Sequence, residues 1–98
     1  MIFGSVTFKY HLNIFHIMIK VYSRNNDPYS DMLKNLLKFY QISYENIEVS
    51  RNKAALKEMI NLSGQSTTPV LIVDDKAFVG FDRKKIKEVL GLPEDQAQ

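Results

Sequence analysis

The residues of this chain best suited to chemistry are Asp27-Pro28-Tyr29-Ser30, at the junction between a predicted strand and a predicted helix. The start of a helix exposes unpaired N–H groups and the positive end of the helix dipole, so it favours a negative group. Asp27 supplies a carboxylate at this position, and Pro28 suits the first position of a helix. The sequence therefore predicts a negatively charged helix start.

The chain has no thiol chemistry of its own, because it contains no cysteine. This excludes disulfide bonds, thiolate metal ligands and cysteine nucleophiles. The two histidines, His11 and His16, have no nearby cysteine or suitably spaced carboxylate. They are better interpreted as surface or interface residues, and no metal site is predicted.

Seven segments with strand or helix periodicity position this helix start. In chain order we predict a strand at 19–23, a helix that begins at Pro28, a strand at 42–49, a helix capped by Ser50 and ended at Ser63-Gly64, strands at 70–73 and 77–79, and a helix capped by Asp82 and ended by Gly91. The helix residues predicted to face the core are Met32, Leu33, Leu36, Leu37, Tyr40, Ala55, Leu56, Met59, Ile60, Leu62, Ile86, Val89 and Leu90.

This order of elements predicts the fold class α/β. The first two strands, joined by a helix, should lie parallel with a right-handed crossover, and the last two strands form an antiparallel hairpin. The result is a mixed four-stranded sheet (βαβαββα) flanked by helices. We interpret the basic run 83–87 as a solvated helix face, and Tyr22, Phe39, Tyr40 and Phe78 as core or hairpin packing.

Length and composition indicate one small domain: 98 residues, 45% hydrophobic and 24% charged. We divide the chain into an extension at 1–17, a domain at 18–92 and a flexible tail at 93–98. Residues 6–14 alternate apolar and polar, which predicts an extra edge strand; Met18 also resembles a protein start, and the extension is then a gene-start artefact. A strand there would pair with an edge of this sheet or of a second copy, so a homodimer through 1–17 is a candidate.

Charge and hydropathy give no reason to expect a nucleic-acid or membrane partner. The net charge is only +2, and no apolar run approaches the roughly 20 residues needed to span a bilayer. Polar residues interrupt the apolar region that a signal peptide would need, so the expected location is the cytoplasm.

Four separated motifs resemble the glutaredoxin branch of the thioredoxin fold and cover residues 18–92. They are Val21-Tyr22-Ser23, Asp27-Pro28-Tyr29-Ser30, Ser66-Thr67-Thr68-Pro69-Val70 and Val79-Gly80-Phe81-Asp82. Glutaredoxins carry Cys-Pro-Tyr-Cys at the helix start, a Thr-Val-Pro loop with a cis proline, and a Gly-rich or Gly-Phe turn before the last helix. This chain departs from that pattern at both cysteines, which are replaced by Asp27 and Ser30.

The resemblance implies a ligand groove beside the helix start. Pro69 would be cis and face the helix, and the backbone of Thr68 would pair with a bound peptide. Arg24 would hold a carboxylate of glutathione, and the backbone near Phe81 and Asp82 would meet its glutamyl end. Small members with a Gly-Phe-Asp turn often take electrons from a reductase and bind glutathione poorly. The implied groove residues are Arg24, Tyr29, Thr68, Pro69, Phe81 and Asp82.

Thiol–disulfide exchange needs an attacking thiolate, and this chain has none. We therefore predict a degenerate active site without catalytic residues, in a non-catalytic binding or regulatory module that uses the groove. The alternative is a glutathione-dependent thiol-disulfide oxidoreductase by descent, with a role in redox homeostasis and electron transfer, now inactive or dependent on an external thiol. The candidate ligands are glutathione or a thiol-containing peptide or protein, and no other cofactor is predicted.

Three further interpretations stay open. Asp27 either caps its helix, an effect worth about 0.5–2 kcal/mol, or also imitates the charge of the missing thiolate for a partner that recognises it. A glutathione transferase would use the hydroxyl of Ser30 or Tyr29, but Asp27 would repel the glutathione thiolate and a second domain is lacking. A structural protein would dimerise through residues 1–17.

Overall fold

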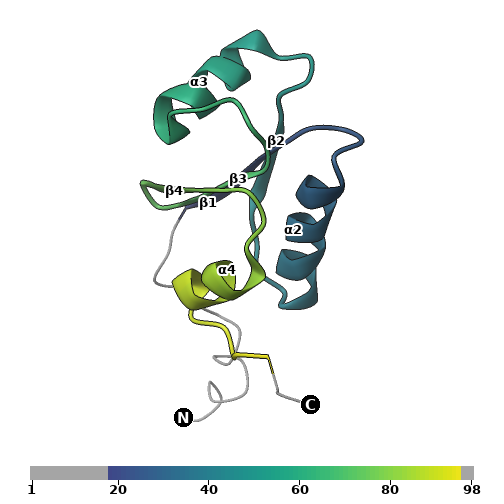
Figure 1. The fold of residues 1–98 in the computed structure, drawn as a ribbon, viewed down its shortest axis with the longest axis vertical. Coiled ribbons are helices and arrows are strands. Elements are labelled where there is room, and N and C mark those ends of the chain that lie inside the picture. Colours follow the sequence, from purple (N-terminus) through teal and green to yellow (C-terminus); the bar gives the residue numbers. More distant parts are fainter. Residues whose placement is uncertain (1–17, 96–98) are drawn as a thin grey trace.

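The computed structural model describes residues 18–95, which form a mixed sheet with helices on both faces (Figure 1). The predicted N-terminal strand and the dimer through 1–17 lie outside the described residues. The elements are β1 (Ile19–Ser23), α2 (Pro28–Phe39), β2 (Glu45–Glu48), α3 (Lys53–Ser63), β3 (Val70–Val73), β4 (Lys76–Val79) and α4 (Arg83–Leu90). The strand order is β2-β1-β3-β4, with β1 parallel to β2 and the other pairs antiparallel. The predicted βαβαββα fold is confirmed.

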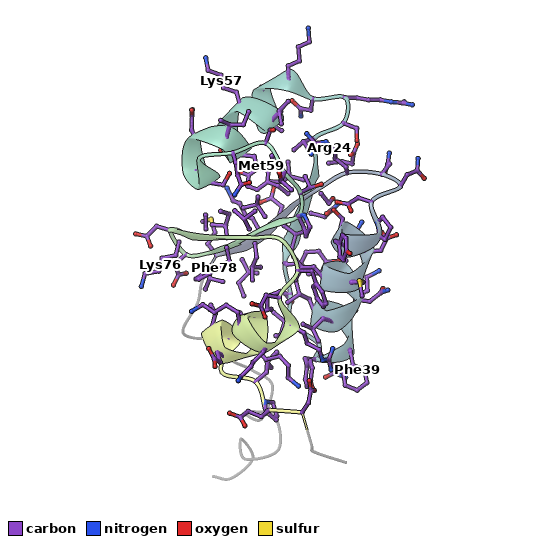
Figure 2. All side chains as sticks on the ribbon, in the orientation of Figure 1. Arg24, Phe39, Lys57, Met59, Lys76 and Phe78 are labelled. Atoms are coloured by element: carbon purple, nitrogen blue, oxygen red, sulfur yellow. The ribbon has the colours of Figure 1, made fainter. Side chains whose placement is uncertain are left out.

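Alternation along the strands divides the core into two clusters. Val21 and Leu71 point to the face covered by α2 and α4, whereas Tyr22 and Val70 point to the face covered by α3 (Figure 1). This is the period-two alternation of a sheet buried on both sides. Met59, fully buried, points from α3 toward the sheet (Figure 2). The larger cluster therefore lies beneath α2, the helix that carries Asp27 at its start.

Two element boundaries differ from the sequence predictions. Asn52, not Ser50, caps α3, because its side chain accepts a hydrogen bond from the Ala55 amide at 2.9 Å. Ser50 is unavailable as a cap, since its amide and hydroxyl both donate to Glu48. β2 is shorter than the predicted 42–49, because the amide of Ile42 bonds to Leu37 and completes the C-terminal turn of α2.

Several predicted core residues are instead exposed. Met32 and Phe39 on α2, and Ile60 and Leu62 on α3, all present their side chains to solvent. α3 is the only helix among the described residues on its face of the sheet, so a narrow stripe with Ala55 and Met59 meets the strands. Core packing was therefore wrongly predicted for these four residues.

Lys87 contradicts the prediction that the basic run 83–87 is a solvated face. It is only 3% exposed, and its ammonium donates to the Tyr40 hydroxyl at 3.0 Å and to Asp95 at 2.7 Å. Arg83 donates two further hydrogen bonds to the same carboxylate, at 2.8 and 3.1 Å. Asp95 was expected in a flexible tail, yet the two cations bind it to α4. These hydrogen bonds hold the pKa of the Asp95 carboxyl well below its usual range.

Asp95→Asn is expected to lower the midpoint of thermal unfolding, because it leaves the buried Lys87 ammonium without a carboxylate. The pKa of Asp95 is lowered in the folded state, so its contribution is complete above the usual aspartate pKa of about 4 and is lost as the pH falls below it. Melting curves followed by circular dichroism should show a constant difference from wild type near neutral pH and a shrinking one in acid. Asp31→Asn is the control, since Asp31 forms only an exposed 3.8 Å pair with Lys34. A difference that persists unchanged in acid would contradict the assignment.

Candidate functional site

The connection between β1 and α2 places Asp27 at the start of its helix. Asn26 adopts a left-handed backbone conformation (φ 63°), which asparagine tolerates better than most residues. Asp27 then takes the extended conformation of an N-cap, and Pro28 follows as the first helical residue. The sequence prediction of a proline-started helix with an aspartate cap is confirmed at this junction.

The carboxylate of Asp27 joins two segments that are 41 residues apart in the chain. Its Oδ1 accepts the amide of Tyr29 at 3.1 Å, which is the capping bond. Its Oδ2 accepts the Ser30 hydroxyl at 2.7 Å and the Thr68 hydroxyl at 2.6 Å. Asp27 therefore fastens the start of α2 to the loop before β3, in addition to capping its own helix.

Ser30 is fully buried and has hydrogen-bond partners on both sides. Its hydroxyl donates to Asp27 and accepts the amide of Arg24 at 3.3 Å. Thr68 is also buried, and the Thr68–Pro69 peptide bond is cis. Asp27 and Ser30, which the resemblance aligns with two cysteines, are thus in direct contact with each other, and Asp27 also contacts the loop that carries Pro69.

Hydrogen bonding makes the Asp27 carboxyl more acidic than usual. Partial burial raises its pKa, but the hydroxyls of Thr68 and Ser30 and the amides of Tyr29 and Ser30 together lower the pKa below its ordinary value. The group is therefore ionised at neutral pH. A carboxylate with a lowered pKa is a weak general base, so the pair formed by Asp27 and Ser30 lacks an effective base.

Arg24 lies beside this cluster without contacting Asp27. Its Nη1 donates to the carbonyl of Ser66 at 2.8 Å and lies 3.5 Å from the Thr68 hydroxyl. These bonds hold the side chain of Arg24, a half-buried residue, next to the Thr68–Pro69 loop. The predicted residues Arg24 and Thr68 are thus brought together with Asp27 and Ser30.

Other predicted groove residues lie in different surroundings. Tyr29 is exposed beside Asp27. Phe81 packs against the larger core cluster and lines a pocket with residues of α2. Asp82 uses its side chain to cap α4, accepting the Lys85 amide at 3.1 Å.

Sequence reasoning missed the role of the Thr68 side chain. The resemblance drew attention to its backbone, whereas its hydroxyl donates the shortest hydrogen bond to Asp27. Thr68 and Asp27 each precede a proline, but nothing in the local sequence around either residue indicates that their side chains meet in the fold.

Residues 18–95 contain neither a membrane-spanning helix nor a cluster of metal ligands. No helix in this range is long and apolar enough to cross a bilayer. In the same range, no three side chains of His, Cys, Asp or Glu gather in a geometry that would hold a metal ion.

Comparison with known proteins identifies similar sequences among the glutaredoxins. The Glutaredoxin family model matches residues 19–79. An uncharacterized glutaredoxin-like 8.6 kDa protein in the rubredoxin operon of Clostridium pasteurianum is 33% identical over 73 residues, covering 74% of this chain and 97% of that protein. Glutaredoxin 3 of Escherichia coli K12 is 30% identical over 64 residues, covering 65% of this chain and 77% of that protein.

A solved structure agrees with these sequence matches. The glutaredoxin-like protein NrdH-redoxin from Escherichia coli superposes with a TM-score of 0.64 at 26% identity, over 74% of this chain and 93% of that chain. The family model alone covers more than half of the sequence. The chain therefore belongs to the glutaredoxin family, as a member without cysteine that has Asp27 and Ser30 in its helix-start motif.

Proposed function

We propose that this chain is a binding module, which holds a ligand in the groove between the start of α2 and the Thr68–Pro69 loop without exchanging electrons with it. One observation carries the proposal: the position from which a family thiol would attack holds the carboxylate of Asp27, bound by the Ser30 and Thr68 hydroxyls. A carboxylate forms no stable bond to sulfur, so the groove can receive a ligand but cannot reduce it.

The hydroxyl of Ser30 does not replace the missing thiol. It is fully buried and already donates to Asp27, so it cannot reach a bound disulfide or activate a bound thiol. This also weighs against a transferase that would use Ser30. Tyr29 is exposed at the helix start, and its amide binds the Asp27 carboxylate, whose charge would repel a thiolate bound there.

The groove retains groups that suit an extended ligand. Within residues 18–95 the main-chain N–H and C=O of Thr68 make no hydrogen bond, which leaves both for a strand-like partner. Arg24 is held at the same place by Ser66 through one of its nitrogens. These groups support glutathione or a thiol-containing peptide as the ligand class, with Arg24, Tyr29, Thr68, Pro69, Phe81 and Asp82 as the proposed contacts.

Titration of the ¹⁵N-labelled protein with glutathione tests this proposal. We expect amide shifts at Arg24, Thr68 and Asp82, and weaker binding as the pH rises through the thiol pKa of about 8.5, because Asp27 repels the thiolate. S-methylglutathione, which cannot ionise at sulfur, is the matched probe and should show no such pH dependence. Shifts confined to other surfaces, or an equal pH response of both ligands, would contradict the proposed groove.

Family membership favours a second candidate, an oxidoreductase that depends on an external thiol. The NrdH-redoxin of Escherichia coli is described as having a thioredoxin-like activity profile. A thiol–disulfide exchange assay with glutathione as the reductant separates the two candidates. We expect a rate equal to that of glutathione alone, and any turnover above this background would overturn the binding-only proposal.

A further inference from the structure

A stripe of apolar side chains runs along α2 from the candidate groove toward the far end of the helix. Tyr29, Met32, Leu36 and Phe39 are spaced by three, four and three residues, so they share one side of the helix. Tyr29 is 58% exposed, Met32 47% and Phe39 76%, whereas Leu36 is buried beneath them. Phe39 lies at the C-terminal end of α2 (Figure 2), where its ring meets Tyr40 edge-on at 5.0 Å.

This stripe borders a pocket of about 470 Å³ between α2 and the segment that precedes α4. Apolar side chains of α2 line one side of the pocket and Phe81 lines the other, and two of the lining residues are polar. Its lining residues are Met32, Asn35, Leu36, Phe39, Phe81 and Arg83. Single exposed apolar residues are common on protein surfaces, but exposed residues that adjoin a shaped pocket are typical of docking surfaces. Arg83 is engaged by Asp95, so the pocket contributes little free positive charge.

The end of the stripe next to the candidate groove carries the negative charge of Asp27, which no cationic side chain within residues 18–95 pairs with. The hydrogen-bond donors to the Asp27 side chain are neutral: the amides of Tyr29 and Ser30 and the hydroxyls of Ser30 and Thr68. Within residues 18–95 Asp27 forms no salt bridge, and the nearby guanidinium of Arg24 binds Ser66 instead. The charge lies at the start of α2, and the residue whose amide binds Oδ1, Tyr29, is exposed.

From the apolar stripe and the charge at its end, we infer that this face of α2 docks an amphipathic segment of a partner protein. A lysine or arginine of the partner binds the Asp27 carboxylate and lies against the Tyr29 ring, where ion pairing and cation–π attraction act together. Apolar side chains of the same segment cover Met32 and Phe39 and enter the pocket beside Phe81. The inference adds a surface to the proposed groove and shares the helix start and Phe81 with it.

A pair of synthetic peptides tests the inference by NMR with the full chain. The first is Ac-Lys-Ser-Leu-Ser-Phe-Ser-Leu-NH₂, and the second has glutamate in place of its lysine. We expect amide shifts along α2 with the first peptide, and binding about five- to ten-fold weaker with the second, because one attraction becomes a repulsion. The difference should nearly vanish in about 1 M salt, where the Debye length is about 3 Å.

Variants separate the charge from the apolar surface. Asp27→Asn should remove the preference for the lysine peptide, whereas Asp31→Asn, one turn away and paired with Lys34, should keep it. Met32→Ser with Phe39→Ser should weaken both peptides, and Leu62→Ser, an exposed apolar residue of α3, should weaken neither. Unchanged spectra away from each substituted position show that the fold persists.

Two outcomes would overturn the inference: equal affinity for both peptides at low salt, or shifts that avoid α2. Neither outcome affects the amide shifts at Arg24, Thr68 and Asp82 by which the proposed glutathione groove is tested. Conversely, turnover in the exchange assay would overturn the binding-only proposal and leave this docking surface in place.

Discussion

The double variant Asp27→Cys with Ser30→Cys is expected to reduce a small disulfide substrate at a rate on the order of 100-fold or more above the wild-type background. The two positions are already in contact, since the Ser30 hydroxyl lies 2.7 Å from the Asp27 carboxylate. The helix start that now favours a carboxylate would equally favour a thiolate and lower its pKa. The measurement is the reduction of bis-hydroxyethyl disulfide with glutathione, at equal protein concentration.

The control for this experiment is Asp27→Ser, which removes the carboxylate without adding sulfur. It should stay at background and so separates gained chemistry from a changed charge. Thermal melting of the double variant shows whether it is folded, and thiol titration shows whether both sulfurs are reduced. A folded variant with two titratable thiols and no activity would mean that the groove no longer positions a disulfide.

Asp27→Ala is expected to destabilise the fold by about 2–4 kcal/mol. The helix loses its cap, worth about 0.5–2 kcal/mol, and the buried hydroxyl of Ser30 loses its acceptor, which costs about 1–3 kcal/mol. For a domain of this size the midpoint of unfolding would fall by roughly 10–25 °C. Urea unfolding followed by circular dichroism measures the free energy directly.

Two milder variants divide this loss into its parts. Asp27→Asn keeps a capping oxygen and should lose less than the alanine variant. Thr68→Val removes one hydroxyl donor and should cost about 1 kcal/mol. If Asp27→Ala costs no more than a surface substitution, the bonds to Ser30 and Thr68 do not support the fold.

The same carboxylate predicts an acid dependence of stability. The pKa of Asp27 is lowered in the folded state, so its contribution is complete above the usual aspartate pKa of about 4 and declines as the pH falls below it. The stability advantage of wild type over Asp27→Asn should therefore be constant near neutral pH and disappear in acid. A constant advantage down to low pH would show that the charge contributes nothing.

Local signals in the sequence were sufficient for most of the fold. Aspartates at 27 and 82 are good N-caps, and both caps were predicted and found, although the second oxygen of Asp27 also binds the hydroxyls of Ser30 and Thr68. Ser50 is an equally good cap by type, but Glu48 binds it, and this competition decides in favour of Asn52. The choice between two capping residues depends on a neighbour's side chain, which periodicity does not report.

Long-range contacts were the part that local reasoning did not reach. Lys87 is buried because Tyr40, 47 residues away, and Asp95 both bind its ammonium. Thr68 meets Asp27 across 41 residues. The helical pattern of α2 correctly placed Leu33 and Leu37 in the core, but it also assigned Met32 there, because a helix pattern alone does not show where a neighbouring layer ends.

The three hydrogen bonds of Asp27 have a consequence for descent. A cysteine at position 27 has one sulfur acceptor in place of two carboxylate oxygens, so even as a thiolate it would satisfy the Tyr29 amide and the hydroxyls of Ser30 and Thr68 less well. The single substitution Asp27→Cys would thus supply an attacking thiol at a cost in stability. Selection for stability alone would oppose that substitution. The hydrogen bonds of the carboxylate therefore oppose a change from oxygen to sulfur at position 27 while the fold is preserved.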